Sequence, residues 1–157
     1  MGYFDSVQSA AQLLMPITNE RMLAALDRLE VDYELGDDGT AVFHFERGYF
    51  YYTLSNAPAR DLLSVRGSYR GTFPLEALPA LNEFTNAWNQ QNLFPKVFSY
   101  RIEEDGQGLV ILPVELSMVY VGGATDAQID EHLRAAMQTS LEYFENLASA
   151  FGFGEEE

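Results

Sequence analysis

The sequence has no cysteine, only two histidines and a single tryptophan among its 157 residues. Without cysteine the chain can form no disulfide bond, no thiolate metal site and no cysteine nucleophile. The two histidines, His44 in an expected strand and His132 on the expected polar side of the last helix, are not spaced as zinc ligands. We therefore expect structural or exposed histidines, no bound metal and no cofactor.

Positive charge is also scarce. Nine Lys and Arg residues stand against 24 Asp and Glu residues, and the net charge of −15 argues against binding to nucleic acid or to anionic membrane surfaces. The bases concentrate in residues 41–101, which hold six of them and four acids between two acidic flanks. This pattern favours internal charge matching, or a solubility device, over an anion site.

Long apolar runs are absent as well. No stretch approaches the roughly 20 apolar residues of a membrane-spanning helix. No Lys or Arg precedes Arg21, whereas a secretory signal would need a basic region there. We expect a cytoplasmic protein with one main domain, because a chain of this length can bury a self-sufficient core.

Motifs that carry chemistry are missing too. The sequence has no phosphate-binding glycine loop, no dinucleotide fingerprint and no serine nucleophile elbow. Asp37-Asp38-Gly39 resembles the opening of a calcium loop, but apolar residues follow where ligands are needed, so it predicts a hairpin turn. The adjacent acids at 103–105 and 130–131 would point in different directions and predict surface charge. The protein is therefore expected not to be an enzyme.

The sequence does contain clear helix and strand patterns. Apolar residues at helical spacing predict one helix from Thr18 or Asn19 to about Glu30, and another within 72–92. A capping box at Thr125 and Gln128 opens a long last helix. Strands are expected over residues 33–35, 41–46, 49–54, 61–69, 96–103 and 109–120. The predicted fold class is α+β, an antiparallel β-sheet flanked by helices in the order α-β-β-β-(β)-α-β-β-α.

Several local features refine this expectation. The helix built on Leu81, Phe84 and Trp88 must stop before Pro95, and Asn92 is expected to adopt the left-handed conformation after its last turn. Residues 55–60 are expected to form a loop. Pro113 predicts a bulge or an edge position in the long strand at 109–120.

The strand at 49–54 has no plainly polar face. Tyr49 and Tyr51 lie on one side of it and Phe50 and Tyr52 on the other. A half-solvated sheet should alternate cleanly, so we expect the second face to be partly covered by a helix, the N-terminal segment, another subunit or a ligand. By contrast, Ser64, Arg66, Ser68 and Arg70 form a polar row that predicts a half-exposed strand.

The second half of the chain resembles the YbjN-like family, whose members are described as bacterial sensory transduction regulators. The resemblance covers residues 16–150 and rests on Leu81-Asn82, Trp88-Asn89, Phe94-Pro95-Lys96, Asp105-Gly106 and Thr125-Asp126-Gln128. It implies a fold similar to that of the type III secretion chaperones, which are small, acidic and non-catalytic, often form homodimers and wrap extended segments of a client protein. It supplies no catalytic residues.

These observations predict a non-enzymatic, chaperone-like module that binds an unidentified protein partner and forms a homodimer, with a role in stress or sensory regulation in a bacterium. The expected division is an N-terminal amphipathic segment (1–17, with a short helix in 1–15), one α+β domain (18–152) and an acidic tail (153–157). The alternative is a small-molecule binder or an unrecognised enzyme with a pocket between Trp88, the sheet and the last helix. The candidate interface residues are Tyr49, Phe50, Tyr51, Tyr52, Trp88, Phe94, Pro95 and Lys96.

Overall fold

The computed structural model describes residues 13–57 and 60–152, and this part of the chain folds as an α+β structure. Its helices are α1 (Asn19–Arg28), the 3-10 turn η2 (Leu75–Ala77), α2 (Leu78–Gln91) and α3 (Asp126–Phe151). Its strands are β1 (Glu34–Leu35), β2 (Ala41–His44), β3 (Gly48–Ala57), β4 (Arg60–Tyr69), β5 (Phe73–Pro74), β6 (Lys96–Val97), β7 (Tyr100–Glu104), β8 (Gln107–Ile111) and β9 (Pro113–Val119). The predicted class, an antiparallel sheet flanked by helices, is confirmed.

The strands form two antiparallel sheets. The larger sheet has the order β1-β2-β3-β4-β9-β6, and the smaller has the order β5-β8-β7. The two are joined because β8 leads directly into β9, and the backbone N–H of Tyr69 donates to the carbonyl of Leu112 at the junction. The expected single strand at 109–120 is therefore broken at Leu112, next to Pro113, which has no N–H to donate to a strand ladder.

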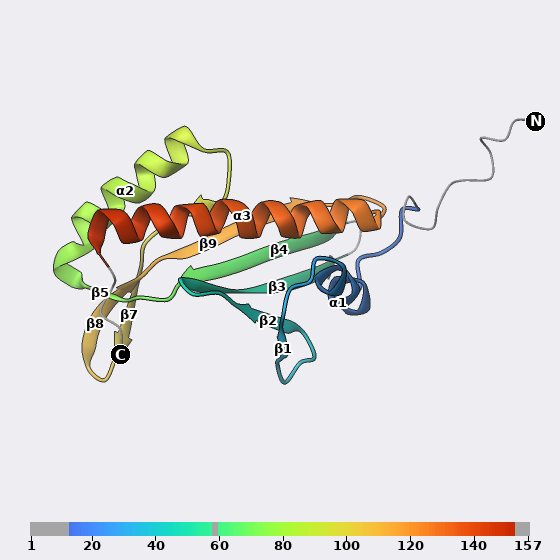
Figure 1. Cartoon of the computed structure of the whole chain (residues 1–157), viewed down its shortest axis with the longest axis horizontal. Helices are drawn as coiled ribbons and strands as arrows, with labels where there is room; N and C mark the ends of the chain where they lie inside the picture. Colours follow the sequence, from blue (N-terminus) through green and yellow to red (C-terminus); the bar gives the residue numbers. More distant parts are fainter. Residues whose placement is uncertain (1–12, 58–59, 153–157) are drawn as a thin grey trace, which may run out of the picture.

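The helices lie on one face of the larger sheet (Figure 1). Helix α3 crosses β3, β4 and β9, α1 packs beside α3, and α2 is joined to α3 through the ring contact of Trp88 with Tyr143. The side chains that point toward the helices form the core, and they include Phe43, Phe50, Tyr52, Leu63, Val65, Val114 and Leu116. The result is a two-layer structure with a covered and an uncovered sheet face.

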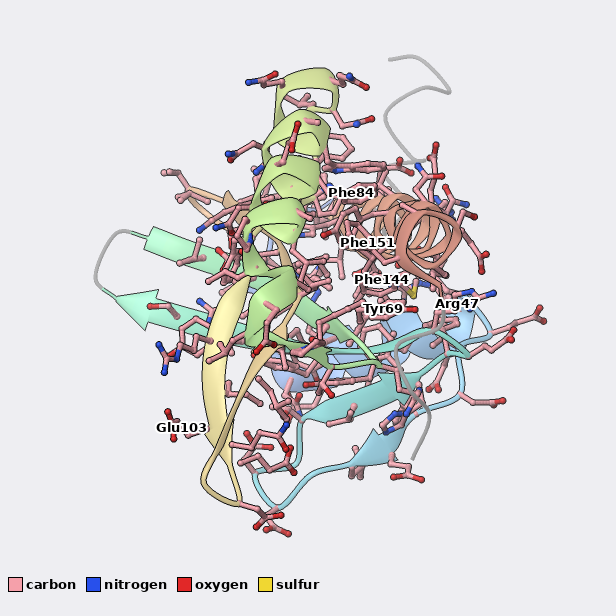
Figure 2. All side chains as sticks on the ribbon, turned by 90° about the vertical axis from the view of Figure 1, so that its left-hand side faces the viewer. Arg47, Tyr69, Phe84, Glu103, Phe144 and Phe151 are labelled. Carbon is pink, nitrogen blue, oxygen red and sulfur yellow. The ribbon has the colours of Figure 1, made fainter. Side chains whose placement is uncertain are left out.

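Aromatic rings fill the core between α2, α3 and the sheet. Phe144 stacks on Phe50 and also contacts Tyr69, with ring centroids 6.0 and 5.8 Å apart. Phe84 meets Phe151 edge-on at 5.5 Å. Figure 2 shows Phe84, Phe151, Phe144 and Tyr69 gathered between the helices and the sheet, whereas Glu103 on β7 points outward. Each fully buried ring contributes about 2–3 kcal/mol to folding by area transfer.

Helix α1 begins and ends near the predicted limits. The side chain of Thr18 caps it by accepting from the N–H of Arg21, and Met22 and Leu26 lie on its buried stripe. Two ion pairs join α1 to the start of α3, namely Arg21–Asp126 at 2.8 Å and Arg28–Asp130 at 2.7 Å. These pairs orient α1 against α3 across more than 100 residues of sequence.

The chain before α1 is attached to the start of α3. Met15 forms a β-bridge with Ala124, through two backbone hydrogen bonds of 3.3 and 2.9 Å. A Cβ added to Gly123 would meet the backbone of Met15 at 2.3 Å, so only glycine permits this approach. The short helix predicted for 1–15 lies mostly outside the described residues, and its end at Met15 is extended rather than helical.

Helix α2 starts with Pro79 in its first turn and ends at Gln91. Asn92, predicted to be left-handed, is instead extended with φ −124° and ψ 138°. That prediction was wrong because the Asn92 side chain caps the helix directly, donating from Nδ2 to the carbonyl of Trp88 at 3.1 Å. The peptide bond between Phe94 and Pro95 is cis.

The loop predicted at 55–60 was also wrong. Strand β3 continues to Ala57, β4 begins at Arg60, and the two pair in register along their whole length. The ladder between β3 and β4 includes residues 55–57 and Arg60, and residues 58–59 of the predicted loop lie outside the described part of the chain. The two strands are therefore the longest pair in the sheet.

Candidate protein-interaction surface

The uncovered face of the larger sheet is the main candidate surface. The strand register aligns Val42, Tyr51, Arg66, Glu115 and Lys96 in one row across five strands. Because side chains alternate between the two faces of a strand, all members of this row point away from the helices. We call this surface the open face; it also includes His44, Tyr49, Thr53, Leu62, Ser64, Ser68, Pro113, Ser117 and Val119.

Polar contacts hold the centre of the open face in place. The guanidinium Nε of Arg66 lies 3.4 Å from Oε2 of Glu115. The hydroxyl of Ser117 donates to Oε1 of the same carboxylate at 2.7 Å, and the hydroxyls of Ser117 and Ser64 are 2.5 Å apart. Glu115 thus connects two neighbouring strands, and it presents the guanidinium of Arg66, which is 44% exposed, to solvent.

Aromatic and apolar side chains lie on both sides of this polar centre. Tyr49 and Tyr51 are half-buried on β3, and the ring of Tyr49 lies 6.1 Å from that of His44. At the other end of the open face, Val119 of β9 is opposite Leu62 and is 47% exposed. The open face therefore combines tyrosine and arginine, types that are frequent in protein contacts, with aliphatic groups.

The predicted polar row on β4 proves partly buried. Arg66 and Arg70 are exposed, but Ser64 and Ser68 are only 2% and 5% exposed. Both serines lie on the open face without a helix above them. Both are small side chains on a central strand, where Ser64 lies between Thr53 and Ser117 and Ser68 lies between Tyr49 and Pro113. The prediction of a half-exposed strand was therefore correct for the arginines and wrong for the serines.

The eight candidate interface residues fall into three different environments. Tyr49 and Tyr51 are on the open face, whereas Phe50 and Tyr52, at 0% and 2% exposed, are in the core beneath α1 and α3. Trp88 is also a core residue at 7% exposed. Of the remaining three, Phe94 is half-buried, Pro95 is buried, and Lys96 is exposed on the edge strand β6. Tyr49, Tyr51 and Lys96 are thus the members that the structure leaves accessible on the open face.

The side chain of Asn89 on α2 holds the edge strand β6, which carries Lys96, in position. The amide of Asn89 donates to the carbonyl of Val97 at 2.8 Å and accepts from its N–H at 3.2 Å. This side chain pairs with the backbone as a neighbouring strand would. Helical periodicity gave no sign of this role, and Asn89 stood out only in the Trp88-Asn89 match to the YbjN-like family.

The edges of the larger sheet are short. Strands β1 and β6 have two residues each. Short edge strands offer few unpaired backbone groups to an incoming strand, so they disfavour pairing of another chain at the edge. Pairing of another chain along β1 or β6 is therefore disfavoured.

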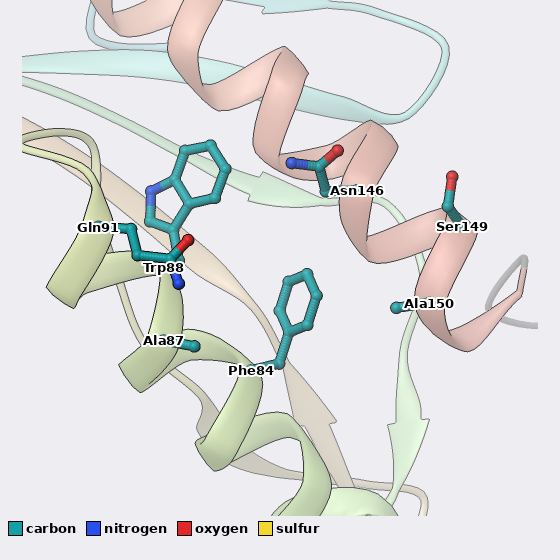
Figure 3. Close-up of a pocket in the computed structure, with 7 residues that line it drawn as sticks. All are labelled: Phe84, Ala87, Trp88, Gln91, Asn146, Ser149 and Ala150. Carbon is teal, nitrogen blue, oxygen red and sulfur yellow. The ribbon is translucent and has the colours of Figure 1, made fainter.

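A groove lies beside Trp88, between α2 and the end of α3, with a volume of about 430 Å³. Figure 3 shows Phe84 and Trp88 reaching from α2 toward α3, with Asn146, Ser149 and Ala150 on the facing helix. Ala87 and Gln91 complete its lining, which contains no charged side chain. The predicted pocket between Trp88, the sheet and the last helix thus corresponds to an open groove between two helices.

His132 is buried, at 4% exposed, rather than on the polar side of α3 as predicted. Its Nδ1 lies 2.8 Å from the hydroxyl of Tyr120, and its Nε2 lies 2.8 Å from the carbonyl of Leu116. The neutral ring satisfies both contacts when Nε2 donates to the carbonyl and Nδ1 accepts from the hydroxyl. Burial lowers the pKa of His132, and burial raises the pKa of Tyr120 to about 12. The pair is thus neutral and structural.

Titratable side chains are dispersed over the rest of the described chain. His44 is exposed and lies 3.5 Å from a guanidinium nitrogen of Arg70. Among residues 13–57 and 60–152, no three His, Cys, Asp or Glu side chains come together in an arrangement that could hold a metal ion. Burial raises the pKa of the Tyr143 hydroxyl, which has no hydrogen-bond partner there. This hydroxyl is enclosed by core rings, so it has no base nearby to activate it.

Ion pairs explain part of the uneven charge along the chain. Three bases of the middle region pair with acids of the C-terminal flank, as Arg47–Glu145 at 2.7 Å, Arg66–Glu115 at 3.4 Å and the local pair Arg101–Glu103 at 3.5 Å. Internal charge matching was predicted, but the partners were not, because they depend on the register of β4 with β9 and on the path of α3. The order of residues along the chain shows neither the strand register nor the path of α3.

Within the described chain, no helix is both long enough and apolar enough to cross a membrane.

The fold and the open face together define a class of protein. In this class an antiparallel sheet packs against helices on one face to form the core, and its other face has no helix over it in the described residues.

Comparison with known proteins identifies the family. A family model described as "Putative bacterial sensory transduction regulator", the YbjN family, matches residues 18–149. The chain belongs to the YbjN family. No curated protein matches the chain.

A solved structure supports the same fold. It is the crystal structure of YbjN from E. coli, described as "a putative transcription regulator", with a TM-score of 0.61 and 20% sequence identity. The similarity covers 88% of this chain and 95% of the E. coli chain. At this identity the comparison establishes the fold alone.

Proposed function

We propose that this protein is a non-enzymatic regulatory module that acts by binding another protein. The observation that carries the proposal is the open face. It presents two half-buried tyrosines and a partly exposed arginine on a rigid sheet, with no helix over them in the described chain. Ordered aromatic groups contribute much contact area at a low cost in conformational entropy.

The family description supports a regulatory role, and the net charge of the chain favours regulation through a protein partner. The YbjN family is described in terms of sensory transduction, and its E. coli member as a transcription regulator. A chain with a net charge of −15 would be repelled by the phosphate backbone of nucleic acid. Regulation by this protein therefore acts through a protein partner rather than through direct contact with DNA.

The same surface is proposed to form a homodimer. The open face is self-complementary in charge, because it carries the Arg66–Glu115 pair, and two copies related by a two-fold axis could place each arginine near the other copy's acid. Its aliphatic end, at Leu62 and Val119, would be buried in such a contact. Such a dimer would supply one of the four covers considered for the second face of β3, the others being a helix, the N-terminal segment and a ligand.

A chaperone-like role is a more specific version of this proposal. It rests on the resemblance to the type III secretion chaperones, which are also small and acidic. A client segment would be apolar and basic, because both flanks of this chain are acidic. The proposed location of such a protein is the cytoplasm.

Affinity capture with matched baits tests the protein-binding role. The wild-type protein, Tyr51→Glu and Tyr100→Glu would each be immobilised and exposed to the same native cell extract. Both substitutions replace a strand tyrosine, but Tyr100 is 56% exposed on β7, away from the open face. We expect one or more proteins to be retained by the wild type and Tyr100→Glu and lost with Tyr51→Glu. Identical capture by all three baits would contradict a role for the open face.

Binding of a small apolar molecule in the groove beside Trp88 is a second candidate function. The groove favours it by its volume and by its apolar lining residues Phe84 and Trp88. Five of its seven lining residues are exposed, however, so a small ligand would remain largely in solvent. The lining also contains no acid, base or paired nucleophile, and it therefore supports binding rather than catalysis.

A further inference from the structure

The groove between α2 and α3 has the form of a docking site for a third helix. The two helices run antiparallel here, because Phe84 contacts Phe151 while Trp88, one turn later in α2, contacts Tyr143, two turns earlier in α3. The lining residues follow helical spacing on both sides. They are Phe84, Ala87, Trp88 and Gln91 on α2, and Asn146, Ser149 and Ala150 on α3.

Small residues keep the groove open. Ala87 and Ala150 are exposed at its walls, and larger side chains there would fill it. Phe84 and Trp88 provide an apolar floor, and Gln91, Asn146 and Ser149 add uncharged polar groups (Figure 3). An apolar floor between two helices with a neutral polar margin suits an amphipathic helix that inserts apolar anchors.

Charge near the groove has one sign. Glu83 lies one helical turn from Ala87, and Glu142 lies one turn from Asn146, so each helix places an acid next to the lining. Helix α2 contains no Lys or Arg, and neither does α3 beyond Arg134. A basic segment would therefore be attracted to this site and an acidic one repelled.

A buried donor at the groove also lacks a partner. Trp88 is 7% exposed, and its indole Nε1 makes no hydrogen bond within the described residues. A buried donor without a partner is uncommon and unfavourable. The nitrogen itself is enclosed, so the part of Trp88 that lines the groove is its apolar ring.

We propose that the α2–α3 groove docks an amphipathic helix of a partner protein, with apolar residues at i, i+3 or i+4 and flanking Lys or Arg residues. The inference rests on the proposed function only in that the partner is a protein. The groove and the open face belong to different sides of the molecule, because one is formed by the helix layer and the other by the uncovered sheet face. Both could be occupied at once.

A model peptide tests the proposal without knowledge of the natural partner. The probe is a fluorescein-labelled helix-forming peptide of Leu and Lys, with Leu at helical spacing, and the controls replace Lys with Glu or scramble the Leu positions. Binding is followed by peptide anisotropy and by the emission of Trp88, the only tryptophan in the chain. We expect saturable binding of the Leu/Lys peptide with a change in Trp88 emission, and at least about tenfold weaker binding of both controls.

Matched substitutions locate the binding site. Ala87→Phe fills the groove and should weaken binding at least about tenfold, whereas Ala127→Phe, at an exposed alanine in the first turn of α3, should have no effect. Ala150→Phe repeats the test from the other wall, should Ala87→Phe fail to fold by circular dichroism. The double variant Glu83→Lys/Glu142→Lys should weaken binding about fivefold at low salt, and Glu34→Lys/Glu104→Lys, with the same change in net charge, should not.

Several outcomes would overturn the inference. They are the absence of saturable binding, a response equal in all peptides, and full binding by both groove-filling variants. Binding of the neutral apolar dye Nile red in the groove without peptide binding would instead identify a small-molecule site. None of these results depends on the open face, so they leave the capture experiment with Tyr51→Glu unaffected.

Discussion

At the scale of single residues, the contact of Tyr120 with His132 shows how the core accommodates polar groups. Each ring is almost fully buried, and each polar atom of the pair has a partner. A buried polar group is tolerated only when it is hydrogen-bonded. The stability of the α3–β9 contact therefore depends on both members.

Removing the hydroxyl of Tyr120 should destabilise the fold. Tyr120→Phe leaves Nδ1 of His132 without its partner, and we expect the free energy of unfolding to fall by about 1–3 kcal/mol. Denaturation by urea measures the change, with Tyr100→Phe at an exposed position as the control. Equal stability of the two variants would show that the contact is not structural.

The same pair predicts a dependence of stability on pH. The pKa of His132 is lowered in the folded state, so below about pH 6.5 the unfolded chain binds a proton that the folded chain does not. The neutral ring therefore makes its full contribution to the free energy of unfolding above that pH, and this contribution is lost as the pH falls. Between pH 7.5 and 5.5 the wild type should lose up to about 1 kcal/mol more than His132→Gln. Parallel profiles for the two proteins would contradict this assignment.

The position of His132 also shows why helical periodicity wrongly predicted it to lie on the polar side of α3. A stripe of Ile129, Leu133 and Met137 defines the buried side of α3, and His132 lies next to that stripe. The buried face of α3 extends from this stripe toward the side of His132, where it also includes Ala136 and Tyr143. Periodicity gives the centre of a buried helix face, but its width depends on the surface beneath.

At the scale of secondary-structure elements, α3 and α1 were predictable because their signals are local. The capping box at Thr125 and Gln128 is present with both hydrogen bonds, and Thr18 caps α1. The two-residue strands β5 and β6 were not predicted as separate elements, because only distant partners on β8 and β9 define them. On the open face the sequence identified Tyr49 and Tyr51, but the Arg66–Glu115 contact required the strand register.

The attachment of β6 to α2 gives a prediction at this scale. Asn89→Ala removes two hydrogen bonds to Val97, whose backbone is buried, and should lower the free energy of unfolding by about 1–3 kcal/mol. Asn86→Ala, at an exposed position of the same helix, should change it by less than about 0.5 kcal/mol. Chemical denaturation compares the two. If they are equally stable, Asn89 does not secure the edge strand.

At the scale of the whole molecule, the separation of two sheet faces is the central feature. One face is used for the core by α1, α2 and α3, and the other remains accessible with Tyr49, Tyr51 and Arg66. The sequence indicated that both faces of β3 are aromatic, but it could not show which one the helices cover. That choice is made by the packing of α3 on Phe50.

Static light scattering after size-exclusion chromatography tests this account most directly. At micromolar concentration the wild type and Tyr100→Glu should have about twice the chain mass of 17.7 kDa, because the open faces of two copies are in contact. Tyr51→Glu adds a charge beside Arg66 on that face and should elute as a monomer with unchanged circular dichroism. A clean monomer for the wild type would remove the dimer, and a dimer that persists in Tyr51→Glu would place the contact elsewhere than on the open face.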